Sequence, residues 1–184
     1  MSRPRIEGYA VISREGMIAE ADGSFPAAIK VEADQIFYQA ALARADAIAN
    51  GKYSGELQPR SAERRRLILT RRIPALAIDP KYPKAVHWNP AGATFAEAWA
   101  KFGLAHGTLA VAGATDVFGL FLDIGYDSFF LSCAQGSVPD GRSVFPGVGP
   151  SLSAQEVLKR KGYVLSASRV LDPATNTILE EYGR

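Results

Sequence analysis

The sequence contains few of the residues on which several classes of protein depend. Its 184 residues include one cysteine, Cys133, so the chain can form no internal disulfide and offers no pair of thiolates to a zinc ion. The two histidines, His87 and His106, are too far apart in the sequence to predict a metal site. No apolar run approaches the roughly 20 residues that cross a membrane as a helix. We therefore expect a cytoplasmic protein that holds no metal ion and does not enter a membrane.

Several well-known motifs are also missing. The chain has no Gly-x-Ser-x-Gly elbow, no Walker phosphate loop and no Gly-x-Gly-x-x-Gly fingerprint, which argues against a hydrolase and a nucleotide kinase. The net charge of +2 gives no reason to expect a nucleic-acid partner. The positive charge is unevenly placed, however, because six of the thirteen residues at positions 60–72 are arginine.

What the sequence does contain is an alternation of strand-like and helix-like segments. With 47% hydrophobic residues, the chain is long enough for one domain with a full core, which we place at residues 1–184. The alternation predicts an α/β fold, with a mixed, mostly parallel central sheet, helices on both faces and an antiparallel C-terminal edge. We expect strands at residues 6–13, 46–49, 67–70, 85–88, 108–112, 128–133, 163–169 and 177–182, and helices at 32–44, 94–102 and 115–122.

Two strand endings carry most of the functional signal. One strand runs directly into Thr70-Arg71-Arg72, and another breaks at Gly113 and restarts as a helix near Thr115. If these strands are neighbours, a cationic fork and a helix N-terminus face the same anionic ligand, which is the arrangement of a nucleotide site. The alternatives are a basic loop that only faces water, and a glycine that only allows a tight turn.

The order of these signals resembles the dihydrofolate reductase family and its relative, the reductase domain of riboflavin biosynthesis. The resemblance extends over nearly the whole chain as an order of elements, and four short motifs carry it. In chain order they are a Gly-Arg-x-Thr-like turn at Gly51-Lys52-Tyr53-Ser54, a phosphate-holding strand end at Thr70-Arg71-Arg72, a Gly-Gly-like turn at Val111-Ala112-Gly113-Ala114-Thr115, and a late Phe-Pro loop at Ser143-Val144-Phe145-Pro146.

The resemblance implies an NADPH cofactor. Arg71 or Arg72 would pair with its 2′-phosphate, and N–H groups at the start of the helix near Thr115 would face its pyrophosphate. Asp116, in the first turn of that helix, would repel a phosphate placed too close. The cofactor contacts implied by the resemblance are Ala10, Gly51, Lys52, Ser54, Thr70, Arg71, Arg72, Ala112, Gly113, Ala114, Thr115, Asp116 and Val117.

The substrate side of such a site needs a carboxylate at the start of the helix at residues 32–44. Asp34 is the better candidate than Glu32, because it shares a helix face with Phe37. Against an apolar wall its pKa would rise, and it could orient or protonate a pteridine-like or pyrimidine-like ring. The alternative is that Asp34 only complements the positive end of its helix. Ser132 matches the family's threonine that hydrogen-bonds the ring or the carboxylate, and Phe37 completes the predicted substrate contacts.

The chain also departs from the family pattern. Ala114 replaces the second glycine of the pair, so the family's cis peptide, if present, lies between Gly113 and Ala114. Lys52 replaces an arginine, and Phe25-Pro26 is only a loose counterpart of the usual Pro-Trp.

The resulting hypothesis is an NADPH-dependent reductase that transfers a hydride to a pteridine-like or pyrimidine-like heterocycle. One alternative is the riboflavin-pathway ribosylaminopyrimidine reductase, whose phosphorylated sugar the basic stretch at residues 60–66 could serve. Another is a nucleotide-binding protein that has lost catalysis. We otherwise expect Arg64, Arg65 and Arg66 to be surface charge, and the C-terminal edge strands to suit a homodimer.

Overall fold

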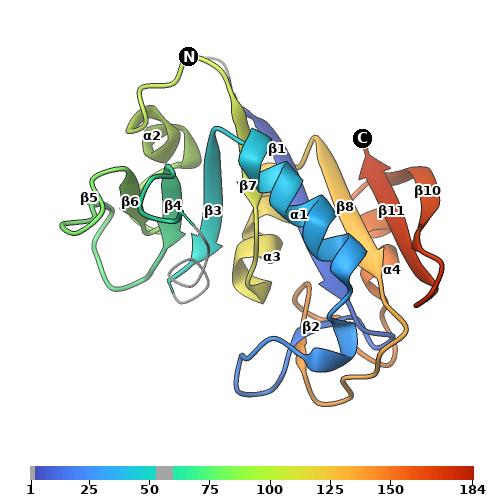
Figure 1. Cartoon of the computed structure of the whole chain (residues 1–184). Helices are drawn as coiled ribbons and strands as arrows, with labels where there is room; N and C mark the ends of the chain where they lie inside the picture. The colour runs from blue at the N-terminus through green and yellow to red at the C-terminus, as the bar shows by residue number, and fades with distance from the viewer. Residues whose placement is uncertain (1–2, 53–59) are drawn as a thin grey trace.

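The computed structural model describes residues 3–52 and 60–184, which form one nine-stranded sheet flanked by helices (Figure 1). The strand order is β10-β11-β8-β1-β7-β3-β4-β6-β5, and β2 pairs with β9 in a separate two-stranded sheet. The strands are β1 (Arg5–Ile12), β2 (Met17–Ala19), β3 (Ala47–Gly51), β4 (Arg66–Leu69), β5 (Leu76–Ile78), β6 (Ala85–Trp88), β7 (Thr108–Val111), β8 (Ser128–Cys133), β9 (Arg142–Ser143), β10 (Val164–Asp172) and β11 (Thr177–Gly183). The helices are α1 (Glu32–Arg44), α2 (Phe95–Ala100), α3 (Thr115–Ile124) and α4 (Ala154–Arg160), with a 3-10 turn η1 (Ala27–Ile29).

The pairing confirms the predicted mixed, mostly parallel sheet. Strands β8, β1, β7, β3, β4 and β6 run parallel to one another. The antiparallel pairs lie at the two edges, where β11 joins β10 and β8, and β5 joins β6. The predicted C-terminal antiparallel edge is therefore confirmed.

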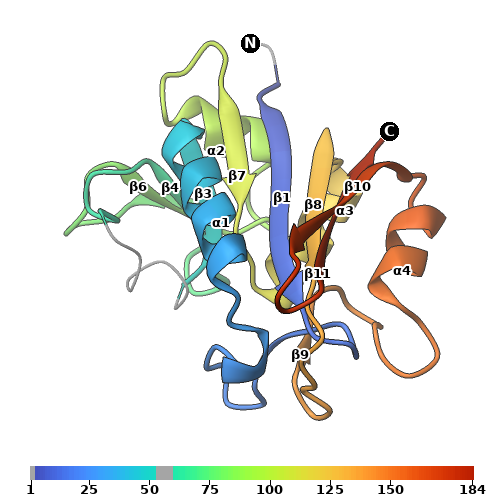
Figure 2. The same cartoon turned by 45° about the vertical axis from the view of Figure 1, so that its right-hand side comes forward.

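The two faces of the sheet bury different clusters of side chains. Along β1, Tyr9 packs with residues of α1, whereas Ile6 and Ile12 pack in the larger core formed with α2, α3 and α4. This alternation follows from the period of two in a strand. Figures 1 and 2 show α1 alone on one face and the other helices behind the sheet. Helices thus cover both faces, as the sequence pattern predicts.

The structure also corrects two expectations. The strands that end at Thr70 and Gly113 are not neighbours, because β3 lies between β4 and β7. Arg66 is not surface charge: it is the first residue of β4, only 3% exposed, with its guanidinium carbon 4.9 Å from the centre of the Tyr82 ring. The aromatic ring gives this buried cation a favourable contact that water would otherwise supply.

Candidate active site

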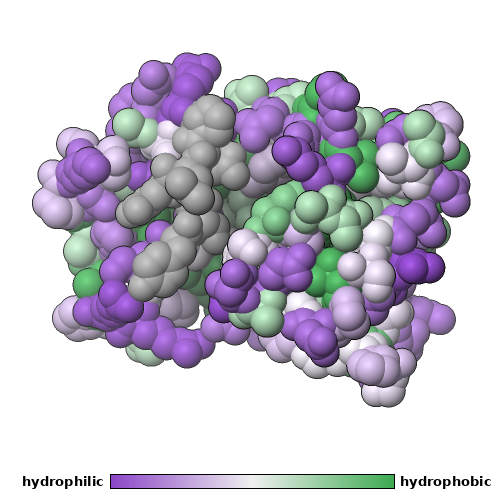
Figure 3. Space-filling view, turned by 60° about the horizontal axis from the view of Figure 1, so that its bottom comes forward, coloured by the Kyte–Doolittle hydropathy of each residue, from purple (hydrophilic) through white to green (hydrophobic). Residues whose placement is uncertain are grey.

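The predicted site residues gather where the parallel strands end. Ser132 is near the end of β8, Gly51 ends β3, and Thr70 and Gly113 follow β4 and β7. Asp34 enters from the first turn of α1. Figure 3 views this side of the molecule and shows apolar residues within a border of polar ones. The carboxyl ends of parallel strands are where α/β sheets commonly bind ligands.

Asp34 is a buried carboxylate that lies near a buried hydroxyl group. It is 8% exposed, although it lies in the first turn of its helix. Burial raises its pKa, and a hydrogen bond from the buried Ser132 side chain opposes the rise only in part. The structure therefore brings these two predicted site residues near each other. Such a carboxyl keeps its proton to a higher pH than an ordinary aspartic acid and can donate it to a ring nitrogen.

Tyr38 is a site residue that the sequence reasoning missed. Burial first, and the charge of Asp34 second, raise its pKa to about 12, and the charge of Arg64 opposes both. Tyr38 therefore lies within electrostatic reach of both Asp34 and Arg64. The spacing in the sequence could have indicated this residue, because Tyr38 follows Asp34 by four residues and lies one helical turn along the same face.

Arg64 also differs from the expected surface charge. It is partly buried, and its Nη1 atom is buried without a hydrogen-bond partner among the described residues. A buried guanidinium nitrogen without an acceptor is costly unless a ligand or water supplies one. Its electrostatic contact with Tyr38 puts this unused donor on the same side of the molecule as Asp34.

Phe37, the predicted substrate contact, lies in an aromatic cluster. Its ring centre is 6.0 Å from that of Tyr9 and 5.7 Å from that of Phe130, and the guanidinium carbon of Arg169 lies 5.8 Å from it. These contacts join α1 to β1, β8 and β10. Phe37 packs the helix onto the sheet, whereas Tyr38 is the aromatic residue whose ionisation responds to Asp34.

The turn after β7 has the backbone that the resemblance implies. The peptide bond between Gly113 and Ala114 is cis, and Gly113 has φ +93°, a conformation that favours glycine. The Gly51 amide donates a hydrogen bond of 3.1 Å to the Gly113 carbonyl, which joins the ends of β3 and β7. Helix α3 then begins at Thr115, and Ala114 offers no side-chain acceptor to its first N–H groups. These amides can therefore serve an anion.

The late loop closes over the same turn. The Thr115 hydroxyl donates a hydrogen bond to the Ser143 carbonyl, and the Phe145 ring packs on Phe118 of α3. This loop contains the Phe-Pro sequence of the fourth motif, so the structure brings the third and fourth motifs into contact.

Arg71, one of the two arginines of the predicted cationic fork, contacts the first turn of α3, although β3 lies between β4 and β7. Arg71 Nη2 lies 3.3 Å from Asp116 Oδ2. The Arg72 amide donates to the Thr70 hydroxyl at 3.2 Å, which shapes the turn after β4. An arginine and the N-terminus of α3 therefore face the same region, although their strands are not adjacent.

The remaining predicted cofactor residues have varied environments. Ala10, Lys52 and Ala112 are half-buried and Val117 is buried, whereas Ser54 lies outside the described residues. The first three belong to β1, to the turn after β3 and to the turn after β7, so they stand on the elements that surround the Gly113 turn.

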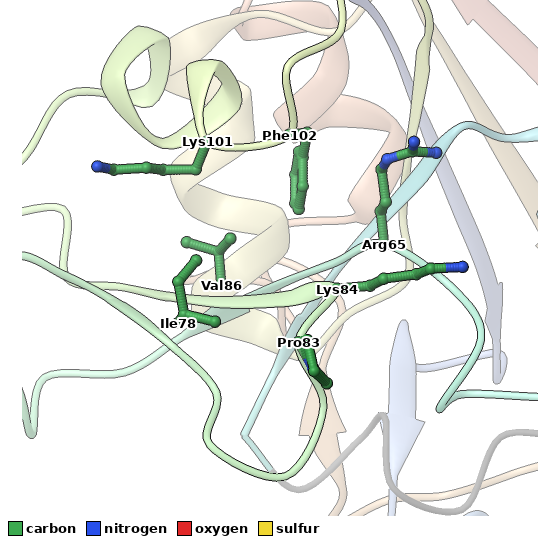
Figure 4. A pocket seen from close by; sticks show the side chains of 7 residues that line it. All are labelled: Arg65, Ile78, Pro83, Lys84, Val86, Lys101 and Phe102. Atoms are coloured by element: carbon green, nitrogen blue, oxygen red, sulfur yellow. The ribbon is translucent and has the colours of Figure 1, made fainter.

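A shallow pocket of about 150 Å³ lies elsewhere (Figure 4). The amino groups of Lys84 and Lys101 point away from its centre on opposite sides. Because Arg65 and Lys84 precede β4 and β6, the pocket is at the opposite end of these strands from Thr70 and is separate from the candidate site. Its lining residues are Arg65, Ile78, Pro83, Lys84, Val86, Lys101 and Phe102.

Within residues 3–52 and 60–184, no group of three or more His, Cys, Asp or Glu side chains is placed to hold a metal ion. No helix there has the length and apolar character needed to span a membrane.

Comparison of the sequence with models of protein families and with curated proteins gives no match. Solved structures do match. Dihydrofolate reductase from Enterococcus faecalis, complexed with NADP(H) and RAB-propyl, superposes with a TM-score of 0.63 at 15% identity, over 98% of this chain and 96% of that one. The fold is dihydrofolate-reductase-like.

Two riboflavin-related structures share this dihydrofolate-reductase-like fold. A putative riboflavin biosynthesis protein from Shewanella sp. PV-4 has a TM-score of 0.64 at 15% identity, with 98% of both chains covered. A diaminohydroxyphosphoribosylaminopyrimidine deaminase/5-amino-6-(5-phosphoribosylamino)uracil reductase from Thermotoga maritima has a TM-score of 0.62 at 18% identity. The match covers 98% of this chain but only 56% of the Thermotoga chain. At these identities the likeness establishes the fold, and the chemistry must be argued from the site.

Proposed function

We propose that this protein is an NADPH-dependent oxidoreductase that transfers a hydride to a pteridine-like or pyrimidine-like heterocycle. The observation that carries the proposal is the buried Asp34 carboxyl, with its raised pKa and the buried Ser132 hydroxyl nearby, at the strand ends where Arg71 and the Gly113 turn also lie. The reductases among the solved structures of the same fold support the oxidoreductase class.

The residues around the Gly113 turn fit a dinucleotide. The first N–H groups of α3 have no side-chain acceptor from Ala114, and the glycine lets the backbone approach a ligand closely. Arg71 and Arg72 would hold the 2′-phosphate, with Lys52 as a point charge nearby. The reduced nicotinamide of the cofactor supplies the hydride.

Asp34 would supply the proton that completes the reduction. Hydride addition to the carbon of a ring C=N bond leaves the nitrogen in need of a proton. Burial keeps the Asp34 proton available at a pH where an exposed aspartic acid would have lost it. The nearby Ser132 hydroxyl would orient the carboxyl toward the ring, and the packing of Phe37 fixes the helix that carries it.

Arg64 favours a substrate with an anionic tail. Its buried Nη1 has no acceptor among the described residues, and its charge reaches Tyr38 beside Asp34. A phosphorylated sugar, as in the riboflavin-pathway alternative, or a carboxylate would satisfy this donor. Arg64→Ala should therefore raise KM for a substrate with such a tail by roughly tenfold or more and leave NADPH affinity unchanged.

The first experiment measures cofactor binding and turnover together. We expect NADPH to quench protein fluorescence at lower concentration than NADH, and the absorbance of the reduced nicotinamide to fall with a heterocycle from a panel of pteridines and ribosylaminopyrimidines. Asp34→Asn should retain NADPH affinity and lower kcat by a factor of at least about 100, since general acid catalysis contributes this much.

Glu32→Gln is the matched control, because it removes a carboxylate from the same helix turn at an exposed position. Full activity of the Asp34→Asn variant would refute the assigned role. Tight NADPH binding without turnover of any panel compound would favour the alternative of a nucleotide-binding protein without catalysis.

A further inference from the structure

The Arg71–Asp116 ion pair joins two parts of the site that would otherwise have different roles. Arg71 follows β4 and is the predicted partner of a 2′-phosphate, whereas Asp116 is in the first turn of α3, where the amides are predicted to face a pyrophosphate. The guanidinium nitrogen and the carboxylate oxygen are 3.3 Å apart. The Asp116 carboxylate is therefore already paired with the Arg71 guanidinium that a 2′-phosphate would need.

We propose that Asp116 is a specificity-determining residue that weakens binding of the 2′-phosphorylated dinucleotide by competing for the Arg71 guanidinium. The inference rests on the proposed function, because it concerns the same cofactor site. It assigns to Asp116 an effect opposite to that of a cofactor contact.

The exposure of the pair makes competition its main effect. The two side chains are 86% and 78% exposed, so the ion pair contributes little to folding stability. The same exposure leaves both charges accessible to an incoming ligand. A dianionic phosphate that reaches Arg71 must displace the carboxylate or bind beside it, and either event costs free energy.

Coulomb's law gives the size of the effect. Two negative charges about 6 Å from a carboxylate, in water and at physiological salt, lower affinity by a factor of roughly three to ten. A dinucleotide with a free 2′-hydroxyl lacks these charges and escapes the penalty.

The test compares NADPH and NADH affinities for the unaltered protein and for Asp116→Asn. We expect the substitution to tighten NADPH binding by roughly three- to tenfold and to change NADH binding by less than about twofold. The NADPH gain should shrink as salt is raised.

The control is Asp123→Asn, which removes the same charge from the same helix. Asp123 is exposed and pairs with Lys161 at 2.7 Å, at the other end of α3. This variant should leave the ratio of the two affinities unchanged. Equal effects of Asp116→Asn and Asp123→Asn would indicate a general charge effect and would overturn the inference.

Arg71→Ala identifies the group for which Asp116 competes. In an Arg71→Ala background, Asp116→Asn should give a smaller NADPH gain than in the unaltered protein, because the shared guanidinium is gone. An undiminished gain, or an Asp116→Asn variant with an unchanged affinity ratio, would overturn the inference while leaving the proposed function standing. If the unaltered protein and Asp116→Asn bind neither dinucleotide, the proposed function and this inference both fail.

Discussion

Burial and hydrogen bonding move two carboxyl groups of this protein in opposite directions. Asp34 is buried, and loss of water raises its pKa. Glu15 lies in the turn after β1 and accepts hydrogen bonds from Ser137, Val138 and Ser13, which together lower its pKa to about 2. One group therefore keeps its proton to a higher pH than an ordinary aspartic acid, and the other is suited to remaining an anion that fixes structure.

The raised pKa of Asp34 predicts a pH-dependent cost in stability. The folded state binds this proton more tightly than the unfolded chain, so the contribution favours folding below the ordinary pKa of aspartate and is lost as pH rises through the raised pKa. At pH 8 the Asp34→Asn variant should therefore have a higher melting temperature than the unaltered protein, and its unfolding free energy should be larger by about 1 kcal/mol. At pH 4 both differences should be smaller. Thermal denaturation across this range, with Glu32→Gln as control, measures them. A difference that does not grow with pH would contradict the desolvation argument.

Glu15 makes the opposite prediction. Its oxygens accept hydrogen bonds from Ser137 Oγ at 2.6 Å, from the Val138 amide at 2.8 Å and from Ser13 Oγ at 2.7 Å. Because its pKa is lowered, this stabilisation is present above the ordinary pKa of glutamate and is lost as pH falls toward 2. Glu15→Ala should lower the unfolding free energy by about 1–2 kcal/mol at pH 7 and by less near pH 2, as followed by urea titration. Glu20→Ala, an exposed change in the adjacent loop, is the control.

At the scale of elements, the sequence predicted eight strands and three helices, but it missed helix α4 and the strands of two or three residues. The strand at β8 and the helix α1 were found because each repeats its apolar pattern over several residues. Strands β5 and β9 have three and two residues, too few for a pattern, and tertiary pairing alone defines them. The position of β3 between β4 and β7 was also beyond the sequence, because strand order depends on contacts between segments far apart in the chain.

In the candidate site, too, some residues could be predicted from the sequence and others could not. Asp34, Ser132 and the Gly113 turn were predicted because motif order gives their positions. Tyr38 and the burial of Arg64 were not, since both depend on how α1 and the segment before β4 approach each other in space.

The turn between β7 and α3 yields a prediction of its own. Gly113 has φ +93°, and a Cβ added there would lie 3.1 Å from the Phe118 ring. Gly113→Val should therefore destabilise the protein by about 1–3 kcal/mol and weaken NADPH binding, because the turn that presents the α3 amides must shift. Gly103→Val is the control: it also has positive φ, at +65°, but its added Cβ would meet nothing within 4 Å. Equal NADPH affinity of the two variants would remove this turn from the cofactor site.

At the scale of the whole molecule, the two edges of the sheet differ. The edge strand β5 has three residues, whereas β10 has nine, and Val164, Leu165 and Val170 on it are exposed. A long apolar edge offers unpaired backbone groups to another strand. We therefore propose that β10 pairs with β10 of a second copy in a twofold dimer, because the three-residue β5 is too short to favour head-to-tail pairing.

The edge asymmetry supports the homodimer that the sequence suggested, and light scattering can test it. We expect a mass of twice 19.8 kDa for the unaltered protein and of 19.8 kDa for Val170→Lys, because a charge on the edge opposes strand pairing. Ile78→Lys is the matched control, since Ile78 on β5 is 53% exposed and Val170 is 52% exposed. That variant should stay dimeric, and Val170→Lys should keep its NADPH affinity because β10 contributes none of the proposed cofactor contacts. A mass of 19.8 kDa for the unaltered protein at every concentration would exclude the dimer.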